Sequence, residues 1–345
     1  MKKQTNGARL FLNILCTLLG FVLVAGIAAT VYVSYLSGLI GRDDGSQETL
    51  SQEQIQEILQ EETIAPDAST APVMNEEDVD WGENEGEVIE TGKDIVNILL
   101  IGQDARPGQT RSRSDSMILL TFNPEAKTIT MTSFLRDIYV QIPGIGGDKL
   151  NHTYVYGGMQ LLDKTLEQNF GVQVDGNVEV DFSRFPEVID LLGGVDMELR
   201  QDEANYINFG TGRYVLSAGM QHLDGEQALF YSRIRHLDAD ADFSRTNRQR
   251  KVINALIEQF RNAKLTTLLG LLDDLLPMIT TDLSNSDIID LATDLFPMLA
   301  DCTIVSQRIP ADGTYDFKTI REMSCVVVDM DAARKLMEET IGGSK

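Results

Sequence analysis

The chain has 345 residues, of which 43% are hydrophobic, and carries a formal net charge of −24 at pH 7. This length allows one large domain or two small ones with appendages. The acidic charge excludes a protein that binds a nucleic-acid backbone through a diffuse basic surface, and residues 93–345 alone keep a net charge of −12. The three histidines are far apart and lack the spacing of a zinc site.

The first forty residues have the pattern of a membrane anchor. Three basic residues precede a stretch without any charge from Leu10 to Ile40. A helix over Phe11–Tyr35 would be roughly 37 Å long, enough to cross a bilayer core of about 30 Å, whereas a cleaved signal peptide, the alternative, has a shorter apolar region. The basic end predicts a cytoplasmic tail over 1–9, a single transmembrane signal-anchor helix over 10–40 and an extracytoplasmic remainder.

Residues 41–92 differ sharply from what precedes them. They carry sixteen Asp or Glu and a single basic residue, Arg42. The spacing of Ile55, Ile58 and Leu59 allows a short helix, but the segment has too few apolar residues to build a core. We therefore predict a disordered, solvated acidic linker.

From residue 93 the pattern changes to alternating strands and helices. Runs of aliphatic and β-branched residues predict strands over 94–102, 114–122, 127–134, 138–143, 177–181 and 195–199. Helical spacing predicts helices over 154–170, 182–194 and 243–263, another beginning within 223–236, and two amphipathic helices within 264–300. This alternation predicts an α/β fold in which helices sandwich a mixed central sheet, an α/β/α architecture.

Two cysteines lie in the exported part, Cys302 and Cys325, on what we predict to be two strands that close the sheet. In an oxidising exterior they can pair as a disulfide. Two separate buried thiols are the alternative, and the sequence does not decide between them.

The predicted helix 243–263 has polar residues on its apolar face. Its apolar stripe, which includes Val252 and Leu256, extends backward to Arg245 and Gln249, with Arg248 at its edge. Buried charges need partners. These side chains therefore either pair with structural carboxylates or line a pocket that holds an anion.

Other arginines gather where strands or helices end, which is where α/β folds bind ligands. They are Arg106, Arg111 and Arg113 after the first strand, Arg136 after the third, and the pair Arg233 and Arg235. Arginine suits bidentate phosphate binding, so the pattern predicts a compact multi-anionic ligand such as a pyrophosphate.

Aspartates accompany these arginines. Asp104 and Asp115 flank the first cluster and either neutralise it or hold a magnesium ion, which proteins bind with one or two carboxylates plus phosphate oxygens. The later run "HLDADAD" lacks the glycine and glutamate of a calcium loop, and we interpret Asp238 and Asp240 as part of a solvated loop.

Five motifs occur in a fixed order along the chain: "NILLIGQDARPGQTRSRSDSMIL", "SFLRDIYVQIPG", "KLNHTYVYGG", "LDGEQALFYSRIRH" and "DFSRTNRQRKVI". Together they resemble the LytR-CpsA-Psr family of cell-wall enzymes, closely over residues 93–263 and loosely over the rest of 93–345. Leu135 stands where proline is common before the Arg-Asp pair, and Ser244 where glycine is common before the later arginine. Both departures affect the backbone more than the ligand chemistry.

The resemblance implies an enzyme with its catalytic domain over 93–345. Family members are understood to move an anionic glycopolymer, such as wall teichoic acid or capsular polysaccharide, from an undecaprenyl-pyrophosphate carrier to peptidoglycan and to release undecaprenyl phosphate. The implied partners are therefore that lipid-linked polymer, the peptidoglycan acceptor and the membrane, with no nucleic acid.

The resemblance also assigns residues, with Mg²⁺ or Mn²⁺ as the cofactor. Asp104 and Asp115 match the metal ligands. The residues that match the pyrophosphate clamp are Arg106, Arg113, Arg136, Arg233, Arg235, Arg245, Arg248 and Gln249. The expected catalytic residues are Asp104, Arg106, Asp115, Arg136, Arg233 and Arg235. Asp137 is expected to orient Arg136, and the general base stays open.

Two alternatives remain on the sequence alone. One is a pyrophosphatase or phosphodiesterase of lipid-linked precursors, in which water replaces the sugar hydroxyl. The other is a non-enzymatic envelope sensor or regulator, of the transcriptional-attenuator type, that only binds polyprenyl pyrophosphate.

Overall fold

The computed structural model describes residues 35–45, 49–51, 53–55, 71–83, 85–103, 111–238, 241–260, 271, 273–299 and 301–342. The predicted tail 1–9 and most of the predicted anchor 10–40 lie outside these residues. So do Asp104, Arg106 and Asp240. Within the part of the chain that is described, no helix is both long and apolar enough to cross a bilayer.

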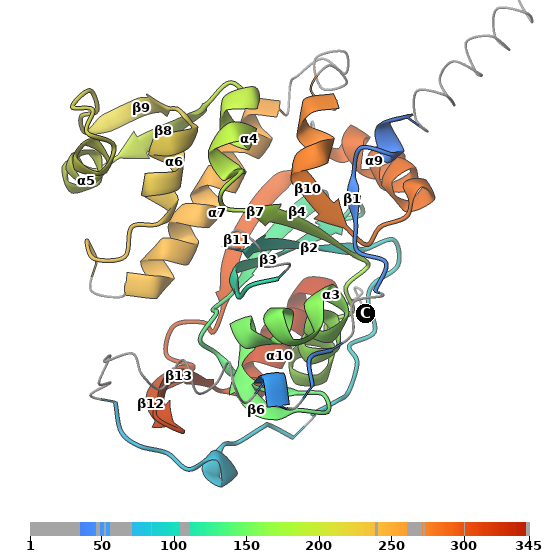
Figure 1. Cartoon of the computed structure of the whole chain (residues 1–345). Helices are drawn as coiled ribbons and strands as arrows, with labels where there is room; N and C mark the ends of the chain where they lie inside the picture. The colour runs from blue at the N-terminus through green and yellow to red at the C-terminus, as the bar shows by residue number, and fades with distance from the viewer. Residues whose placement is uncertain are drawn as a thin grey trace, which may run out of the picture.

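A mixed seven-stranded sheet forms the centre of the molecule (Figure 1). Its strands run in the order β1 (Gly41–Arg42), β10 (Ile279–Thr281), β7 (Gly176–Asp181), β2 (Val96–Gln103), β3 (Ser114–Asn123), β4 (Thr128–Phe134) and β11 (Thr303–Ile309). Strands β2, β4, β7 and β11 are parallel to one another, and β3 runs against its neighbours β2 and β4. The carboxyl ends of four strands therefore meet at one edge of the sheet, beside the start of β3.

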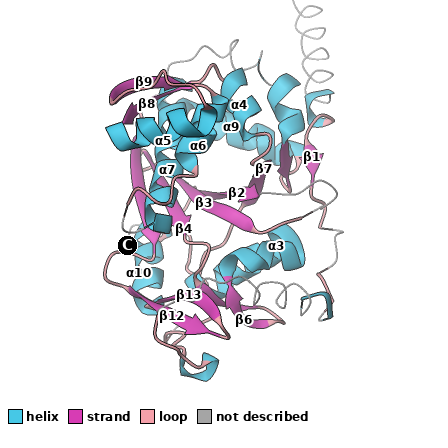
Figure 2. Cartoon of the chain, turned by 60° about the vertical axis from the view of Figure 1, so that its left-hand side comes forward, coloured by secondary structure: helices cyan, strands magenta, loops and turns pink. Residues whose placement is uncertain are grey.

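Helices cover both faces of this sheet, as the strand–helix alternation predicts (Figures 1 and 2). On one face lie α3 (Leu150–Phe170) and α10 (Met330–Ile341). On the other lie α4 (Phe185–Leu191), α7 (Ala241–Phe260) and α9 (Asn285–Leu299). The predicted α/β/α architecture is confirmed.

Smaller elements extend both faces. Helices α5 (Gln201–Thr211) and α6 (Gly225–Ser232) pack with the hairpin β8 (Val195–Leu199)–β9 (Gly219–Leu223) in a lobe beside α7 (Figure 2). Two further hairpins are β5 (Tyr139–Ile142)–β6 (Gly146–Lys149) and β12 (Tyr315–Ile320)–β13 (Met323–Val328). Short 3-10 turns occur at Glu76–Asp78 and Leu276–Met278.

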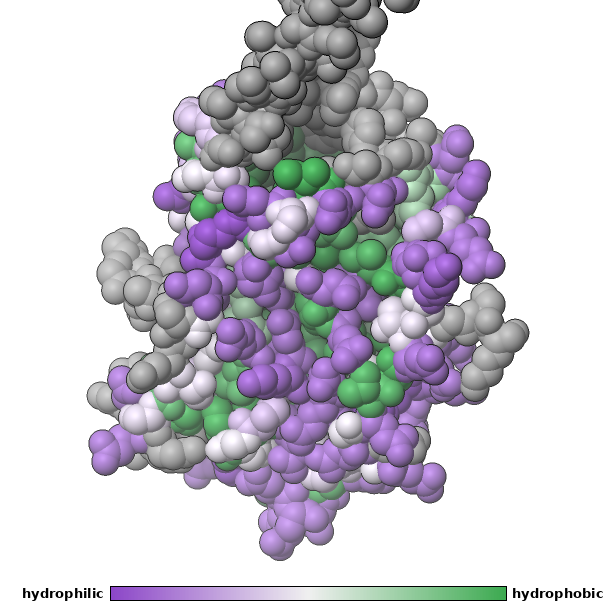
Figure 3. Space-filling model, turned by 90° about the vertical axis from the view of Figure 1, so that its right-hand side faces the viewer, coloured by the Kyte–Doolittle hydropathy of each residue, from purple (hydrophilic) through white to green (hydrophobic). Residues whose placement is uncertain are grey.

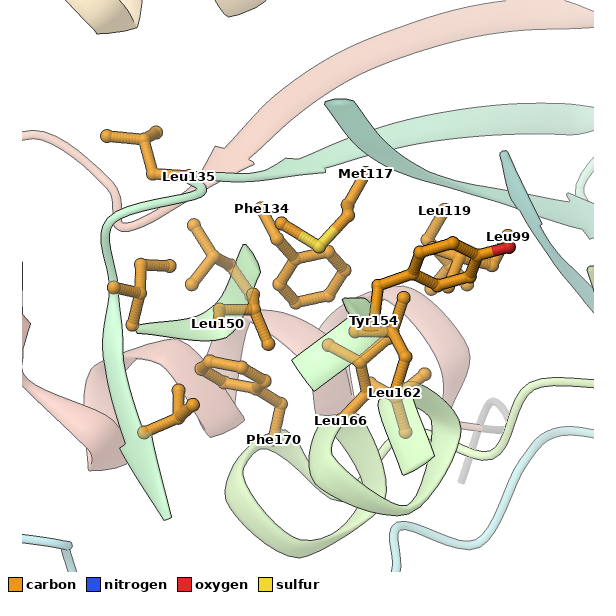
Figure 4. Packing of buried hydrophobic residues seen from close by; sticks show 14 of the residues in the cluster. Leu99, Met117, Leu119, Phe134, Leu135, Leu150, Tyr154, Leu162, Leu166 and Phe170 are labelled. Atoms are coloured by element: carbon orange, nitrogen blue, oxygen red, sulfur yellow. The ribbon is translucent and has the colours of Figure 1, made fainter. Parts of the chain in front are cut away.

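The main core lies between the sheet and α3 (Figure 4). Alternate residues of the central strands point toward the helix, while Leu162, Leu166 and Phe170 face back at intervals of four. The rings of Phe134 and Phe170 pack with their centroids 5.2 Å apart. Figure 3 shows the face that lies on the right in Figure 1. Hydrophilic residues cover most of its described surface, with hydrophobic residues between them in smaller groups.

The predicted linker is only partly a solvated segment. Residues 71–83 and 85–92, here called the N-terminal strap, pack along the domain, with bridges from Val73 to Thr319 and from Thr91 to Gly342. The Trp81 ring stacks on Tyr139 with centroids 5.9 Å apart. For these residues the prediction of a free acidic spacer is wrong, because apolar side chains such as Val79 and Trp81 pack in a hydrophobic cluster with Tyr139 despite the surrounding charge.

Cys302 and Cys325 are both buried, and no disulfide joins these two described residues. Cys302 immediately precedes β11, which closes one edge of the central sheet, whereas Cys325 lies in β13. Because β13 forms a separate two-stranded sheet with β12 in the described part of the chain, the prediction that both strands close the central sheet holds for β11 alone.

Candidate active site at the carboxyl edge of the sheet

Three of the sequence-predicted arginines, Arg136, Arg245 and Arg233, lie near the edge where β2, β4, β7 and β11 end and β3 begins. At the end of β2, the register of its pairing with β3 shifts between Gly102 and Gln103. A Cβ atom on Gly102 would lie 2.8 Å from the Phe182 ring, so only glycine lets the segment after β7 pack this closely. Such an edge is where ligands of α/β proteins bind.

Asp115, Arg136 and Arg245 form the centre of the site. Arg136 Nη1 donates a 2.8 Å hydrogen bond to Asp115 Oδ1, and Arg245 Nη2 donates a 3.2 Å bond to the Asp115 carbonyl oxygen. Arg245 is only 2% exposed, while the side chains of Arg136 and Asp115 are 22% and 24% exposed. Two guanidinium groups from β4's end and α7 are thus held beside one partly open carboxylate.

A second carboxylate fixes Arg136 from the other side. Asp137 Oδ2 lies 3.3 Å from Arg136 Nε, and Asp137 Oδ1 lies 3.4 Å from Lys149 Nζ. Burial alone would raise the pKa of Asp137, but the charges of Arg136, Lys149 and Arg245 outweigh it and hold that pKa below its usual range. Asp137 is therefore ionised and orients Arg136 at neutral pH. Lys149 was not singled out in the sequence, although it begins the third motif.

Arg233 reaches the same edge from the end of α6, and Arg235 follows it by two residues. The Arg233 guanidinium carbon lies 5.6 Å from the centre of the Phe182 ring, which itself packs against Gly102. Between the two arginines, Ile234 is completely buried, whereas Arg233 is exposed and Arg235 half-buried. Their spacing of two does place both side chains away from the core.

Residues 111–113 approach the edge over a buried polar network. The Ser112 amide donates to Gln103 Oε1 at 2.9 Å, and both Gln103 and Tyr154 donate to the Glu179 carboxylate. Burial raises the pKa of Glu179 above its usual value, against the two hydrogen bonds that lower it. Gln103, Tyr154 and Glu179 were missed in the sequence because nothing in their spacing brings them together.

A break in α3 makes room for Arg111. Gly158 has φ 63° and ψ −154°, which an L side chain rarely adopts. A Cβ atom there would lie 3.0 Å from Arg111 Nη1. Arg113 is half-buried beside Ser114, at the start of β3.

Arg248 has a different environment from Arg245. It is 3% exposed and pairs with Glu203 at 2.9 Å and with Asp238, while its Nη1 donates to the Ile234 carbonyl. Two carboxylates of the domain, Glu203 and Asp238, therefore neutralise its charge. Its role in the pyrophosphate clamp stays a prediction. The interpretation of Asp238 as a solvated residue is wrong, because Asp238 also accepts a 2.8 Å bond from Arg200.

Gln249 follows Arg245 by one helical turn on the same face of α7. It is 8% exposed, and its side-chain oxygen has no hydrogen-bond partner among the described residues. A buried amide oxygen without a partner is suited to a ligand that donates a hydrogen bond to it.

Of the two predicted metal ligands, only Asp115 lies within the described residues. Asp115 offers a partly exposed carboxylate at the edge, with one oxygen bonded to Arg136, while Asp104 lies outside the described residues. Across the described ranges, no group of three or more Asp, Glu, His or Cys side chains could hold a metal ion. Magnesium, however, needs only one or two carboxylates when phosphate oxygens complete its shell, so Asp115 fits such a site.

Comparison with known proteins gives a consistent result. The model of the LytR_cpsA_psr family matches residues 59–340. The chain is 38% identical over 233 residues to the polyisoprenyl-teichoic acid–peptidoglycan teichoic acid transferase TagT of Bacillus subtilis (strain 168), which covers 66% of this chain and 70% of that relative. It is 39% identical over 209 residues to TagU, a transferase of the same name, from Oceanobacillus iheyensis, covering 59% of this chain and 63% of that one.

Solved structures show the same similarity. TagT bound to LIIa-WTA superposes with a TM-score of 0.61 at 32% identity, covering 76% of this chain and 98% of that one. TagT with bound octaprenyl pyrophosphate lipid superposes with a TM-score of 0.54 at 30% identity, with the same coverage. Relatives of this chain therefore bind polyprenyl pyrophosphate and wall teichoic acid.

Proposed function

The chain belongs to the LytR-CpsA-Psr family, and we propose that it transfers an anionic glycopolymer, of the teichoic-acid or capsular type, from undecaprenyl pyrophosphate to peptidoglycan. The observation that carries this proposal is the Asp115–Arg136–Arg245 cluster at the carboxyl edge of the sheet. Its two guanidinium groups suit the two phosphates of a pyrophosphate. Relatives named as teichoic acid transferases supply the reaction class.

The reaction exchanges one phosphorus–oxygen bond for another. The acceptor sugar hydroxyl attacks the phosphorus that carries the glycopolymer, its proton goes to a base, and the bridging P–O bond to the lipid phosphate breaks. The products are a glycopolymer–peptidoglycan phosphodiester and undecaprenyl phosphate. Catalysis of such a step depends on positioning and on neutralising the developing charge on the phosphate oxygens.

The residues of the edge supply these two requirements. Arg136 and Arg245 are held in place before substrate arrives, by Asp137 and by the Asp115 carbonyl respectively. Arg233 approaches from the end of α6 as a third guanidinium group, and the proposal assigns Arg235, two residues later, to the same role. Arg248, by contrast, stabilises the lobe that carries α6, through Glu203 and the Ile234 carbonyl.

We extend the proposal to a divalent cation, Mg²⁺ or Mn²⁺, held by Asp115 together with Asp104. When bound, such an ion neutralises charge on the pyrophosphate oxygens. The partial exposure of Asp115 beside the arginines supports this assignment.

The proposal also includes the location of the enzyme. The uncharged stretch Leu10–Ile40 after a basic N-terminus supports a single-pass anchor with a cytoplasmic tail and an extracytoplasmic catalytic domain. This places the site on the membrane side where a lipid-linked precursor meets peptidoglycan.

A product assay separates this proposal from its alternatives. The full chain in lipid nanodiscs receives a lipid-pyrophosphate-linked oligosaccharide and uncapped peptidoglycan, with and without magnesium, and products are identified by mass. The expected product is a magnesium-dependent phosphodiester adduct that is lost in Asp104→Ala and Arg233→Ala. Lys127→Gln, on the exposed turn between β3 and β4, is the charge-matched control.

Two other outcomes would contradict the transferase. Free phosphorylated sugar without an adduct would indicate a pyrophosphatase or phosphodiesterase. Bound lipid without turnover, under all conditions, would indicate a sensor.

A further inference from the structure

A cavity lies on the α7 face of the sheet, away from the carboxyl edge. It has a volume of about 480 Å³ and lies between α7, β8 and the strands β4 and β11. Four polar residues of α7 line it: Asn247, Arg250, Lys251 and Asn254. Their spacing of three, four and seven puts them in one stripe along the helix, roughly opposite Arg245 at 100° per residue.

Arg250 is the unusual member of this stripe. It is 6% exposed, and its Nε donates a 2.7 Å hydrogen bond to Ser306 Oγ on β11. Its Nη1 is buried and has no hydrogen-bond partner in the described part of the chain. No carboxylate among the described residues forms an ion pair with it, although a buried guanidinium without a counter-charge is costly.

The neighbouring charge makes this arrangement more unfavourable. Arg308 is close enough that its charge, together with burial, lowers the pKa of Arg250 to about 10. Arg308 itself is compensated, since it pairs with Asp312 and lies 4.1 Å from the centre of the Phe243 ring. Arg250 is thus the cation of this pair whose charge the fold leaves uncompensated.

The wall of the cavity opposite Arg250 is acidic, which limits the negative charge of a ligand that can bind there. Asp196 and Glu198 line it from β8, two positions apart on one face of the strand. Asp196 pairs with His222 at 2.7 Å, and neither carboxylate bonds to Arg250 among the described contacts. Acidic groups opposite one arginine disfavour a group with several negative charges close together, such as a pyrophosphate, and together with the two asparagines they suit the hydroxyls of a sugar.

We propose that this cavity is a glycan subsite in which Arg250 binds one monoanionic group, a phosphodiester or a carboxylate, of a hydroxyl-rich chain. The choice of glycans rests on the proposed function, because its two polymeric substrates carry these groups: phosphodiesters in a teichoic-acid-type donor and carboxylates in peptidoglycan. The site is distinct from the carboxyl edge, where Arg136 and Arg245 lie. It would hold a polymer at a second point, away from the reacting bond.

The test measures glycan binding in the absence of any lipid pyrophosphate. The full chain in nanodiscs is titrated by calorimetry with two soluble probes, a delipidated phosphodiester-linked teichoic acid and enzymatically released peptidoglycan fragments. The variants are Arg250→Met, Arg250→Lys and the control Lys127→Gln. Thermal unfolding and the affinity for a short-chain polyprenyl pyrophosphate are measured on the same samples.

The proposal predicts at least a fivefold loss of affinity for one probe in Arg250→Met, with partial recovery in Arg250→Lys and no change in the control. The probe affected identifies the source of the anion. Because an uncompensated charge is removed, the Tm of Arg250→Met stays level or rises, and pyrophosphate affinity is unchanged.

Other results would overturn it. If neither probe binds the unaltered chain, or if both bind Arg250→Met as tightly as the control, the cavity is not a glycan subsite. A Tm lowered by several degrees in Arg250→Met would make the residue part of the fold instead. Failure of the transfer assay, with binding that depends on Arg250, would overturn the proposed function and leave this subsite standing.

Discussion

The buried pair of Arg248 and Glu203 leads to a quantitative prediction about stability. Their side chains are 4% and 6% exposed, and the 2.9 Å contact joins α7 to α5. Arg248→Met leaves the buried Glu203 carboxylate with Arg200, at 4.0 Å, in place of the 2.9 Å contact to Arg248. Removing one partner of such a pair costs about 3–5 kcal/mol, which lowers the Tm of a domain of this size by about 6–20 °C.

The assay is thermal unfolding of the purified chain, followed by circular dichroism, for a double-mutant cycle. Arg248→Met and Glu203→Met are each strongly destabilising. The double variant recovers at least half of the lost stability, because apolar side chains then replace both buried charges. Lys127→Gln again serves as the control and unfolds at the unaltered temperature.

The same experiment tests the role that the sequence assigned to this arginine. If Arg248→Met unfolds at the unaltered temperature but no longer binds polyprenyl pyrophosphate, Arg248 belongs to the ligand clamp and the reasoning from its ion pairs is refuted.

Three further predictions concern pH and the N-terminal strap. Burial and the nearby Asp282 raise the pKa of Asp163 from 3.8 to about 7. The folded state therefore loses stability as the pH rises from about 4 to 7, because ionising this carboxyl is less favourable in the folded than in the unfolded chain. We expect Asp163→Asn to raise the Tm at pH 8 but not at pH 4. The pKa of Asp137 lies below 3.8 in the folded state, so the stability that its ionised form contributes is complete above pH 3.8 and is lost as the pH falls below it. Between pH 6 and 2, the Tm of Asp137→Asn therefore falls less steeply at the acid end than the Tm of the unaltered chain. Deleting residues 1–92 removes the strap and lowers the Tm relative to deleting residues 1–70, and Trp81→Ala in the full chain reproduces part of that loss; equal Tm values would contradict the packing role.

Strong local patterns made the central fold predictable. Strands β2, β3 and β4 have aliphatic runs bounded by turn residues, and α7 has a long apolar stripe. A strand around Cys325 was predicted, but its partner β12 was missed, because Arg321 and Glu322 form the β12–β13 turn at positive φ, where a sequence signal would be Asn-Gly or Gly. Helix α5 was missed because it buries only a narrow stripe, including Ala204 and Ile207, among polar residues.

For the candidate site, the sequence predicted a concentration of arginines and aspartates but not how these side chains pair. Arg245 and Arg248 lie three residues apart on the same helix, and the family resemblance assigns both to the pyrophosphate clamp. Only the tertiary structure brings Glu203 from α5 to Arg248 and the Asp115 carbonyl from β3 to Arg245. The strap shows the same limit, since its acidic composition gives no sign that Trp81 stacks on Tyr139.

The most direct test of the central claim compares two ligands that differ by one phosphate. The full chain is titrated with a short-chain polyprenyl pyrophosphate and with the matching monophosphate, before and after Arg136→Gln, with Lys127→Gln as the control. Since a hydrogen bond to a charged group contributes about 1.5–3 kcal/mol, the chain is expected to prefer the pyrophosphate by at least about tenfold, and Arg136→Gln is expected to abolish most of that preference. Equal affinity for the two ligands, or a preference that Arg136→Gln leaves unchanged, would contradict a pyrophosphate site at this edge of the sheet.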